Sequence, residues 1–96
     1  MGNSIKPDTW VWVVVQDPGS NEQFLGQTDK EDKIDFIPTF LQKEDAQQCF
    51  PQMLKEKGRK YEIQAILFEE LASDAAQNGF MLFVVNVDGE ITEKIS

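Results

Sequence analysis

Two short segments of the chain are apolar at every position, and they constrain the fold more than any other feature. Trp10–Val15 and Phe80–Val85 are both unbroken apolar runs. Neither approaches the roughly 20 apolar residues that a membrane-spanning helix needs. Successive side chains of a strand point to opposite faces. We therefore predict two strands of a soluble domain that are apolar on both faces.

The length of the chain limits it to one domain. A chain of 96 residues buries roughly 60 to 65% of the surface that it exposes when unfolded. Residues 1–8 are mostly polar and include Pro7, which predicts a disordered tail with little to bury. Residues 9–96 are predicted to form a single α+β domain.

The remaining segments predict further strands and two helices. Period-two alternation or β-forming composition marks the strands, and apolar spacing of three and four residues marks the helices. Asp88 and Gly89 predict a hairpin turn between the last two strands. The predicted strands are Thr9–Val15, Phe24–Thr28, Phe36–Leu41, Tyr61–Leu67, Phe80–Val87 and Glu90–Ile95, and the helices run from Lys43 to Lys57 and over Glu69–Gln77.

Two prolines interrupt this pattern. Pro38 cannot donate a ladder hydrogen bond, so its strand is predicted to lie at a sheet edge or to carry a bulge. Pro51 lies within the first helix, whose apolar face continues through it, and therefore predicts a kink. That face comprises Ala46, Cys49, Phe50, Met53 and Leu54.

The predicted order is β-β-β-α-β-α-β-β. Two helices of this length cover about one face of a five-stranded sheet, since a helix is roughly 10 Å wide and strands are about 4.8 Å apart. We therefore expect an α+β fold with a single mixed or mostly antiparallel sheet of about five strands and two helices on one face.

Charge and composition exclude several classes of function. The chain has 17 acidic and 9 basic residues, a net charge of −8, no histidine and one cysteine. The negative charge disfavours nucleic acid, and the missing histidine removes the commonest acid-base group and metal ligand. No glycine-rich phosphate-binding motif is present. We expect no enzyme, no catalytic residues, no metal and no cofactor.

Three carboxylates, an acidic segment and the cysteine are the candidate reactive groups. Glu69, Glu70 and Asp74 offer an alternative as a small enzyme with acid-base residues, although the helix dipole alone favours carboxylates in a first helical turn. The acidic segment Asp29–Asp35 lacks the spacing of a calcium loop. Cys49 lies on an apolar helical stripe and is expected to be a small buried core residue.

The two apolar strands predict a binding surface. If both helices cover one face of the sheet, the other apolar face stays open and is available to a partner or to a second copy of the chain. Its predicted residues are Trp10, Trp12, Val14, Phe80, Leu82 and Val84. The other interpretation is that loops or sheet twist bury these residues.

Three segments together point to a known family: Thr9–Val15, Phe36–Phe40 leading into Lys43–Ala46, and Gly79–Asn86. They resemble the N-terminal domain of bacterial SseB-type proteins. The resemblance implies a small cytoplasmic α+β domain. Members of this family are often described only by a label for enhanced serine sensitivity or type III secretion, and no catalysis is established for them. Met81 replaces a small residue common in the family, Val87-Asp88 replaces Asn-Pro, and the second domain of longer members is missing.

The expected function is therefore a non-enzymatic protein-binding or self-associating module. The alternative is an acidic accessory protein of secretion or stress physiology that binds a basic partner electrostatically. The first residues lack the apolar stretch of an export signal, and a single cysteine forms no internal disulfide. We expect a cytoplasmic protein that binds a protein partner or forms a homodimer, and binds neither nucleic acid nor membrane.

Overall fold

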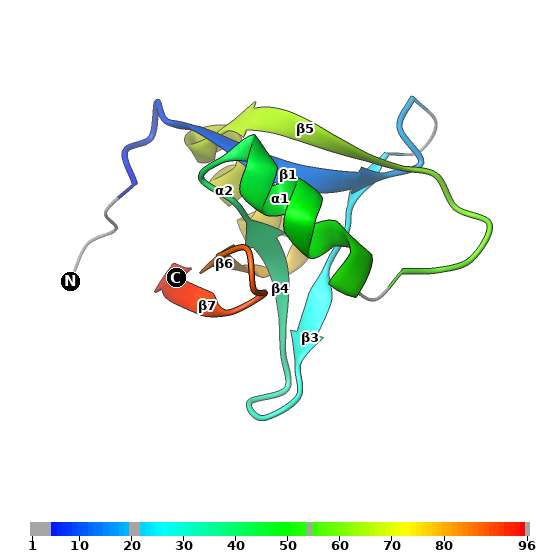
Figure 1. The fold of residues 1–96 in the computed structure, drawn as a ribbon. Helices are drawn as coiled ribbons and strands as arrows, with labels where there is room; N and C mark the ends of the chain where they lie inside the picture. Colours follow the sequence, from blue (N-terminus) through cyan, green and yellow to red (C-terminus); the bar gives the residue numbers. More distant parts are fainter. Residues whose placement is uncertain (1–4, 20–21, 54, 96) are drawn as a thin grey trace.

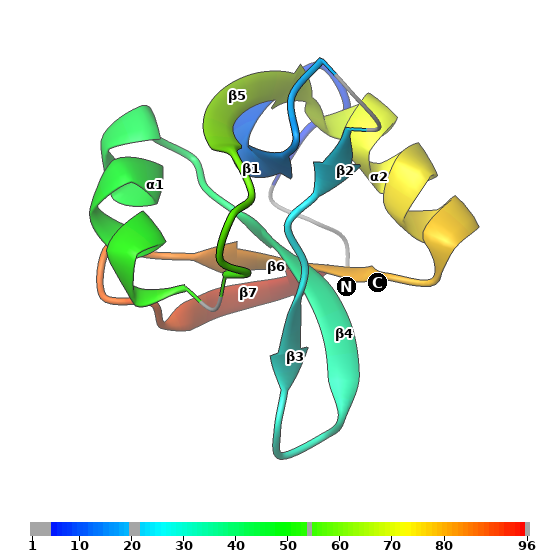
Figure 2. The same cartoon turned by 90° about the vertical axis from the view of Figure 1, so that its right-hand side faces the viewer.

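The computed structural model describes residues 5–19, 22–53 and 55–95. Within these residues the chain forms an α+β fold with two sheets (Figures 1 and 2). The elements are β1 (Trp10–Gln16), β2 (Gln23–Phe24), β3 (Gln27–Asp29), β4 (Ile34–Thr39), α1 (Lys43–Cys49), a 3₁₀ turn (Phe50–Gln52), β5 (Tyr61–Leu67), α2 (Phe68–Asn78), β6 (Met81–Val85) and β7 (Ile91–Ile95).

The strands divide between a three-stranded and a four-stranded sheet. The first has the order β2-β1-β5 and is antiparallel, and the second has the order β3-β4-β6-β7, in which β4 and β6 are parallel. Trp12 and Phe40 join the sheets by exchanging both backbone hydrogen bonds, at 2.8 and 2.9 Å. The mixed α+β class is confirmed, but the single sheet of about five strands was wrong.

The two helices lie on opposite sides of β1, as Figure 2 shows, so the prediction that both cover one face was wrong. The α1-side core comprises Val14, Leu25, Phe36, Phe40, Ala46, Cys49, Met53, Phe83 and Val85. The α2-side core comprises Ile5, Val11, Val13, Val15, Ile37, Phe68, Leu71, Ala75, Leu82, Val84 and Ile95. Alternate residues of β1 and β6 enter different cores, which explains why both strands are apolar throughout.

The predicted strand Phe24–Thr28 is divided between the two sheets. Phe24 pairs with Val15 of β1, whereas Gln27 pairs with Phe36 of β4. The change of sheet occurs at Gly26, where a Cβ atom would lie 2.7 Å from Cε1 of Phe80. Only glycine lets the backbone approach that ring so closely.

The first helix is shorter than predicted. α1 ends at Cys49, and Pro51 lies in the following 3₁₀ turn, because proline at that position would clash with the preceding helical turn. Lys55 therefore follows the helix, and its Nζ donates to the carbonyl oxygens of Phe50 and Met53 at 2.7 and 3.0 Å. Leu54, predicted on the helical face, lies outside the described residues.

The second helix is longer than predicted by about one residue at each end. Phe68 begins it and is buried. The helix ends at Asn78, and Gly79 follows with φ of 77°, a conformation that glycine adopts without steric cost.

The predicted tail lies partly outside the described residues, which begin at Ile5. The expectation that residues 1–8 bury little was wrong for Ile5, which is 8% exposed and belongs to the α2-side core. The carbonyl oxygen of Pro7 accepts a hydrogen bond from the N–H of Glu69 at 3.1 Å. The segment before β1 thus packs against the start of α2.

Candidate functional site

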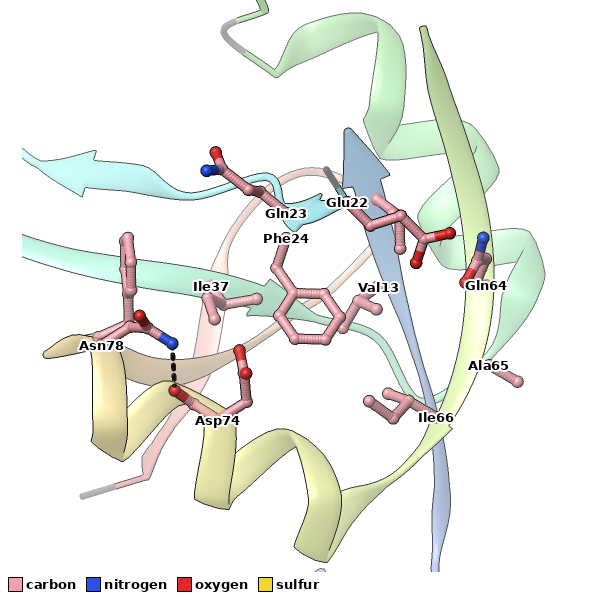
Figure 3. Close-up of a pocket in the computed structure, with 12 residues that line it drawn as sticks. Val13, Glu22, Gln23, Phe24, Ile37, Gln64, Ala65, Ile66, Asp74 and Asn78 are labelled. Carbon is pink, nitrogen blue, oxygen red and sulfur yellow. Dashed lines mark hydrogen bonds between the residues drawn. The ribbon is translucent and has the colours of Figure 1, made fainter. Parts of the chain in front are cut away.

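A cleft of about 710 Å³ opens between α2 and the β2-β1-β5 sheet (Figure 3). The buried side chains of α2, which forms one wall of the cleft, become smaller along the helix. Phe68 and Leu71 fill the first part against the sheet, whereas Ala75 follows in the second part. The cleft is lined by Val13, Val15, Glu22, Gln23, Phe24, Ile37, Gln64, Ala65, Ile66, Asp74, Asn78 and Phe80.

The inner part of the cleft is apolar. Val13 and Val15 project from β1 toward the α2 side, since both belong to the α2-side core. Ile37 of β4 belongs to the same core, and Phe24 and Phe80 are partly buried against it. Figure 3 shows the Phe24 ring in the space between Ile37 and Val13. The burial of an apolar ligand group against these side chains is favourable by about 25 cal/mol per Å².

The rim of the cleft is polar and acidic. Asp74 projects its carboxylate into the cleft from α2 (Figure 3), and this carboxylate has no hydrogen bond or ion pair with a described residue. The backbone oxygen of Asp74 accepts from Nδ2 of Asn78 at 2.8 Å. Across the cleft, Glu22 lies near Gln64, and its Oε1 accepts from the N–H of Gly19 at 2.6 Å.

The chemistry of the lining favours binding of a cation beside an apolar group. Its two charged residues, Glu22 and Asp74, are both acidic, and the described lining includes no lysine or arginine to neutralise them. It offers carboxylates and amides but no thiol, hydroxyl, amine or imidazole.

The open sheet face predicted from the sequence is not present. Val14, Leu82 and Val84 are 1%, 3% and 4% exposed, and Val14 lies in the α1-side core while the other two lie in the α2-side core. They are buried because α1 and α2 pack on opposite sides of these strands. The alternative interpretation expected their burial but attributed it to loops or sheet twist, whereas the two helices take part in both cores.

The other three predicted binding residues have separate environments. Trp10 is 60% exposed. Trp12 is half-buried against the α1-side core, with Nζ of Lys43 at 5.6 Å from its ring centroid. Phe80 alone of the six lines the cleft.

The carboxylates of the enzyme alternative lie together on the outer surface of α2. Glu69, Glu70 and Asp74 share a shallow depression with Ser73 and Gln77. Asp74 is the residue that also lines the cleft. Among the described residues no group of three or more His, Cys, Asp or Glu side chains has a metal-binding arrangement.

Cys49 is buried in the α1-side core, as predicted. Burial raises the pKa of its thiol, and the Lys55 ammonium partly opposes this by lowering it. Arg59 lies in the loop before β5 and makes two ion pairs, in which it donates to Asp17 at 2.6 Å and to Glu56 at 3.1 Å. Both carboxylates raise the pKa of Arg59.

The cleft was not predicted from the sequence, although one signal for it was present. Glu22, Phe24 and Ile37 were not considered as site residues because they come from segments that only the tertiary fold brings together. The decrease in side-chain size from Phe68 and Leu71 to Ala75 was visible in the sequence. Smaller side chains on the buried face of a helix fill less of the space between the helix and a sheet, which is the signal for the cleft.

Comparisons of the chain with protein-family models, with curated proteins and with solved structures gave no match. The resemblance to SseB-type proteins therefore stays a prediction. No helix among the described residues combines the length and apolarity needed to cross a membrane.

Proposed function

We propose that this protein is a binding module that holds a basic, partly apolar segment of a partner protein in the cleft beside α2. The observation that carries the proposal is the Asp74 carboxylate, which projects over an apolar floor without a described partner. A lysine or arginine of the partner would pair with this carboxylate while a neighbouring apolar side chain packs on Val13 and Phe24.

The overall charge supports a basic partner. At −8, the chain attracts basic segments over a Debye length of about 8 Å at physiological salt. The same charge opposes the close approach of a second copy of the chain and of nucleic acid. The cleft thus combines the two kinds of partner binding expected from the sequence, apolar contact and electrostatic attraction.

The test uses a fluorescently labelled heptapeptide of lysine, leucine and valine, ordered so that each face of the extended chain carries both lysine and an apolar residue. Its binding is measured by fluorescence anisotropy, and the site is mapped from the amide NMR shifts of the protein. We expect shifts at Val13, Phe24 and Ile37, and weaker binding as salt rises. Peptides with glutamate for lysine, or with serine for the apolar residues, should bind at least about tenfold more weakly.

Matched variants locate the charge effect. Glu22→Gln with Asp74→Asn should weaken binding roughly threefold to tenfold. Glu69→Gln with Glu70→Gln makes the same change in net charge outside the cleft, and should change affinity less than about twofold. Equal losses from the two double variants, or no shifts at the cleft residues, would contradict the proposed site.

A further inference from the structure

The outer edge of β5 is free within the part of the chain that the structure describes. β5 is a seven-residue strand at the end of the order β2-β1-β5. In Figures 1 and 2 no described element runs alongside this edge. Strand edges of this length are usually blocked by lysine, proline or a bulge. β5 contains none of these, and Glu62 is its one charged residue.

Two backbone hydrogen bonds determine which amides of β5 face outward. At the ends of the β1–β5 ladder the N–H of Phe68 donates to the oxygen of Thr9, and the N–H of Asp17 donates to the oxygen of Lys60, both at 2.8 Å. Hydrogen-bonding direction alternates along an antiparallel strand. Residues 60, 62, 64, 66 and 68 therefore face β1, and the N–H groups of Ile63 and Ala65 point away from it.

A second observation gives the same result. Ala65 is in register with Trp12, and both backbone hydrogen bonds of Trp12 go to Phe40 on the far side of β1. Trp12 and Ala65 are thus a non-hydrogen-bonded pair, which leaves the amide of Ala65 directed outward. No described residue accepts a hydrogen bond from it.

This free edge borders the cleft. Gln64, Ala65 and Ile66 of β5 line it, and Gln64 and Ile66 are in register with Val13 and Val11 of the α2-side core. A strand added about 4.8 Å beyond β5 would direct every second side chain to the face on which the cleft opens.

We propose that the basic segment binds by adding a strand to the outer edge of β5, with backbone hydrogen bonds to Ile63 and Ala65 and alternate side chains at the cleft. The proposal rests on the proposed function. A basic partner is favoured over a second copy because the one charged residue of β5 is Glu62, Glu22 and Asp74 lie on the rim, and a second copy would bring a further charge of −8.

Two isomers of the lysine-containing heptapeptide test the hydrogen bonds. One carries N-methyl groups at its third and fifth residues, and the other at its fourth and sixth. In a strand, these two sets of amides point to opposite edges. We expect one isomer to bind about tenfold or more weakly than the other. Equal affinity of the isomers overturns strand addition, while binding of the unmethylated peptide at the cleft keeps the proposed function.

A variant of the protein, in place of a modified peptide, tests the same backbone hydrogen bonds. Proline at an edge strand is tolerated where its N–H faced solvent, so Ala65→Pro should keep the fold and weaken peptide binding about tenfold. Ala65→Val retains the amide and serves as the control, with an expected change below about threefold. Equal affinities of these two folded variants contradict the proposal.

Hydrogen exchange provides a readout that does not depend on a variant. Peptide binding should slow exchange at Ile63 and Ala65, whereas Gln64 and Ile66 are already bonded to β1. Unchanged exchange at Ile63 and Ala65 in the saturated complex overturns strand addition. So does a dimer of the free protein in sedimentation that Ala65→Pro dissociates, since a second copy then occupies the edge. Failure of every peptide to bind rejects both proposals together.

Discussion

The two cores of this molecule take side chains from the same strands, but only the α2-side core opens into a cleft. The α1-side core is filled by large side chains, including the stacked rings of Phe36 and Phe83 with centroids 4.6 Å apart. The α2-side core is filled beside Phe68 and Leu71 and opens into the cleft beyond them. Because strand side chains alternate, β1 supports a closed structural side and an open side with a candidate binding site.

The largest expected effect comes from truncating a ring in the closed core. Phe83→Ala should lower the free energy of unfolding by about 3 to 5 kcal/mol, because Phe83 is fully buried and leaves a cavity. Phe24→Ala, the same truncation at the cleft, should cost about 1 kcal/mol, because Phe24 is already partly exposed. Urea unfolding measures both, and equal losses would contradict the difference between the cores.

An intermediate effect is expected where the chain changes sheets beside the cleft. Gly26→Ala places a methyl group against the Phe80 ring and should cost about 1 to 3 kcal/mol. Phe80→Leu removes the ring edge, so the double variant should be more stable than the sum of the two single losses. A double-mutant cycle measures this coupling. Strictly additive losses in the free energy of unfolding would contradict a direct contact between the new methyl group and the Phe80 ring.

The smallest effect is a pH dependence of the closed core. Burial raises the pKa of the Cys49 thiol in the folded state, so the folded chain holds this proton more tightly than the unfolded chain. The resulting stability is complete below the unfolded pKa of about 8.5 and is lost as pH rises through the folded value. The free energy of unfolding should thus fall at alkaline pH, less steeply in Cys49→Ala. Urea unfolding at several pH values measures this dependence, and an identical change of the free energy of unfolding with pH in both proteins would contradict the prediction.

Local patterns in the sequence predicted the single elements better than their arrangement. The strand Tyr61–Leu67 was identified from its alternation, and β1 and α2 were found to within one residue at their ends. The placement of the helices was predicted incorrectly, because the uniform apolar composition of Trp10–Val15 is compatible with one covered face or two. Only the tertiary packing of α1 and α2 into two separate cores distinguishes these possibilities.

The same reason explains why the candidate site was missed. Phe80 was selected for its apolar strand, yet its neighbours Phe24 and Ile37 in the cleft come from segments far apart in the chain. Asp74 was predicted only as a helical carboxylate, but its direction over an apolar floor depends on how α2 packs beside the sheet. Such relations arise from tertiary packing, which the spacing of residues along one element does not encode.

The environments of the two tryptophans give the molecule a native optical reporter. Trp10 is mostly exposed, whereas Trp12 is half-buried and lies in register with Ala65. Indole emission depends on solvent contact, so the two side chains should contribute red-shifted and blue-shifted components. With Trp10→Phe, the remaining fluorescence comes from Trp12 alone, one strand away from the free edge of β5. Occupancy of that edge can then be followed by intrinsic emission, without a label on either the protein or its ligand.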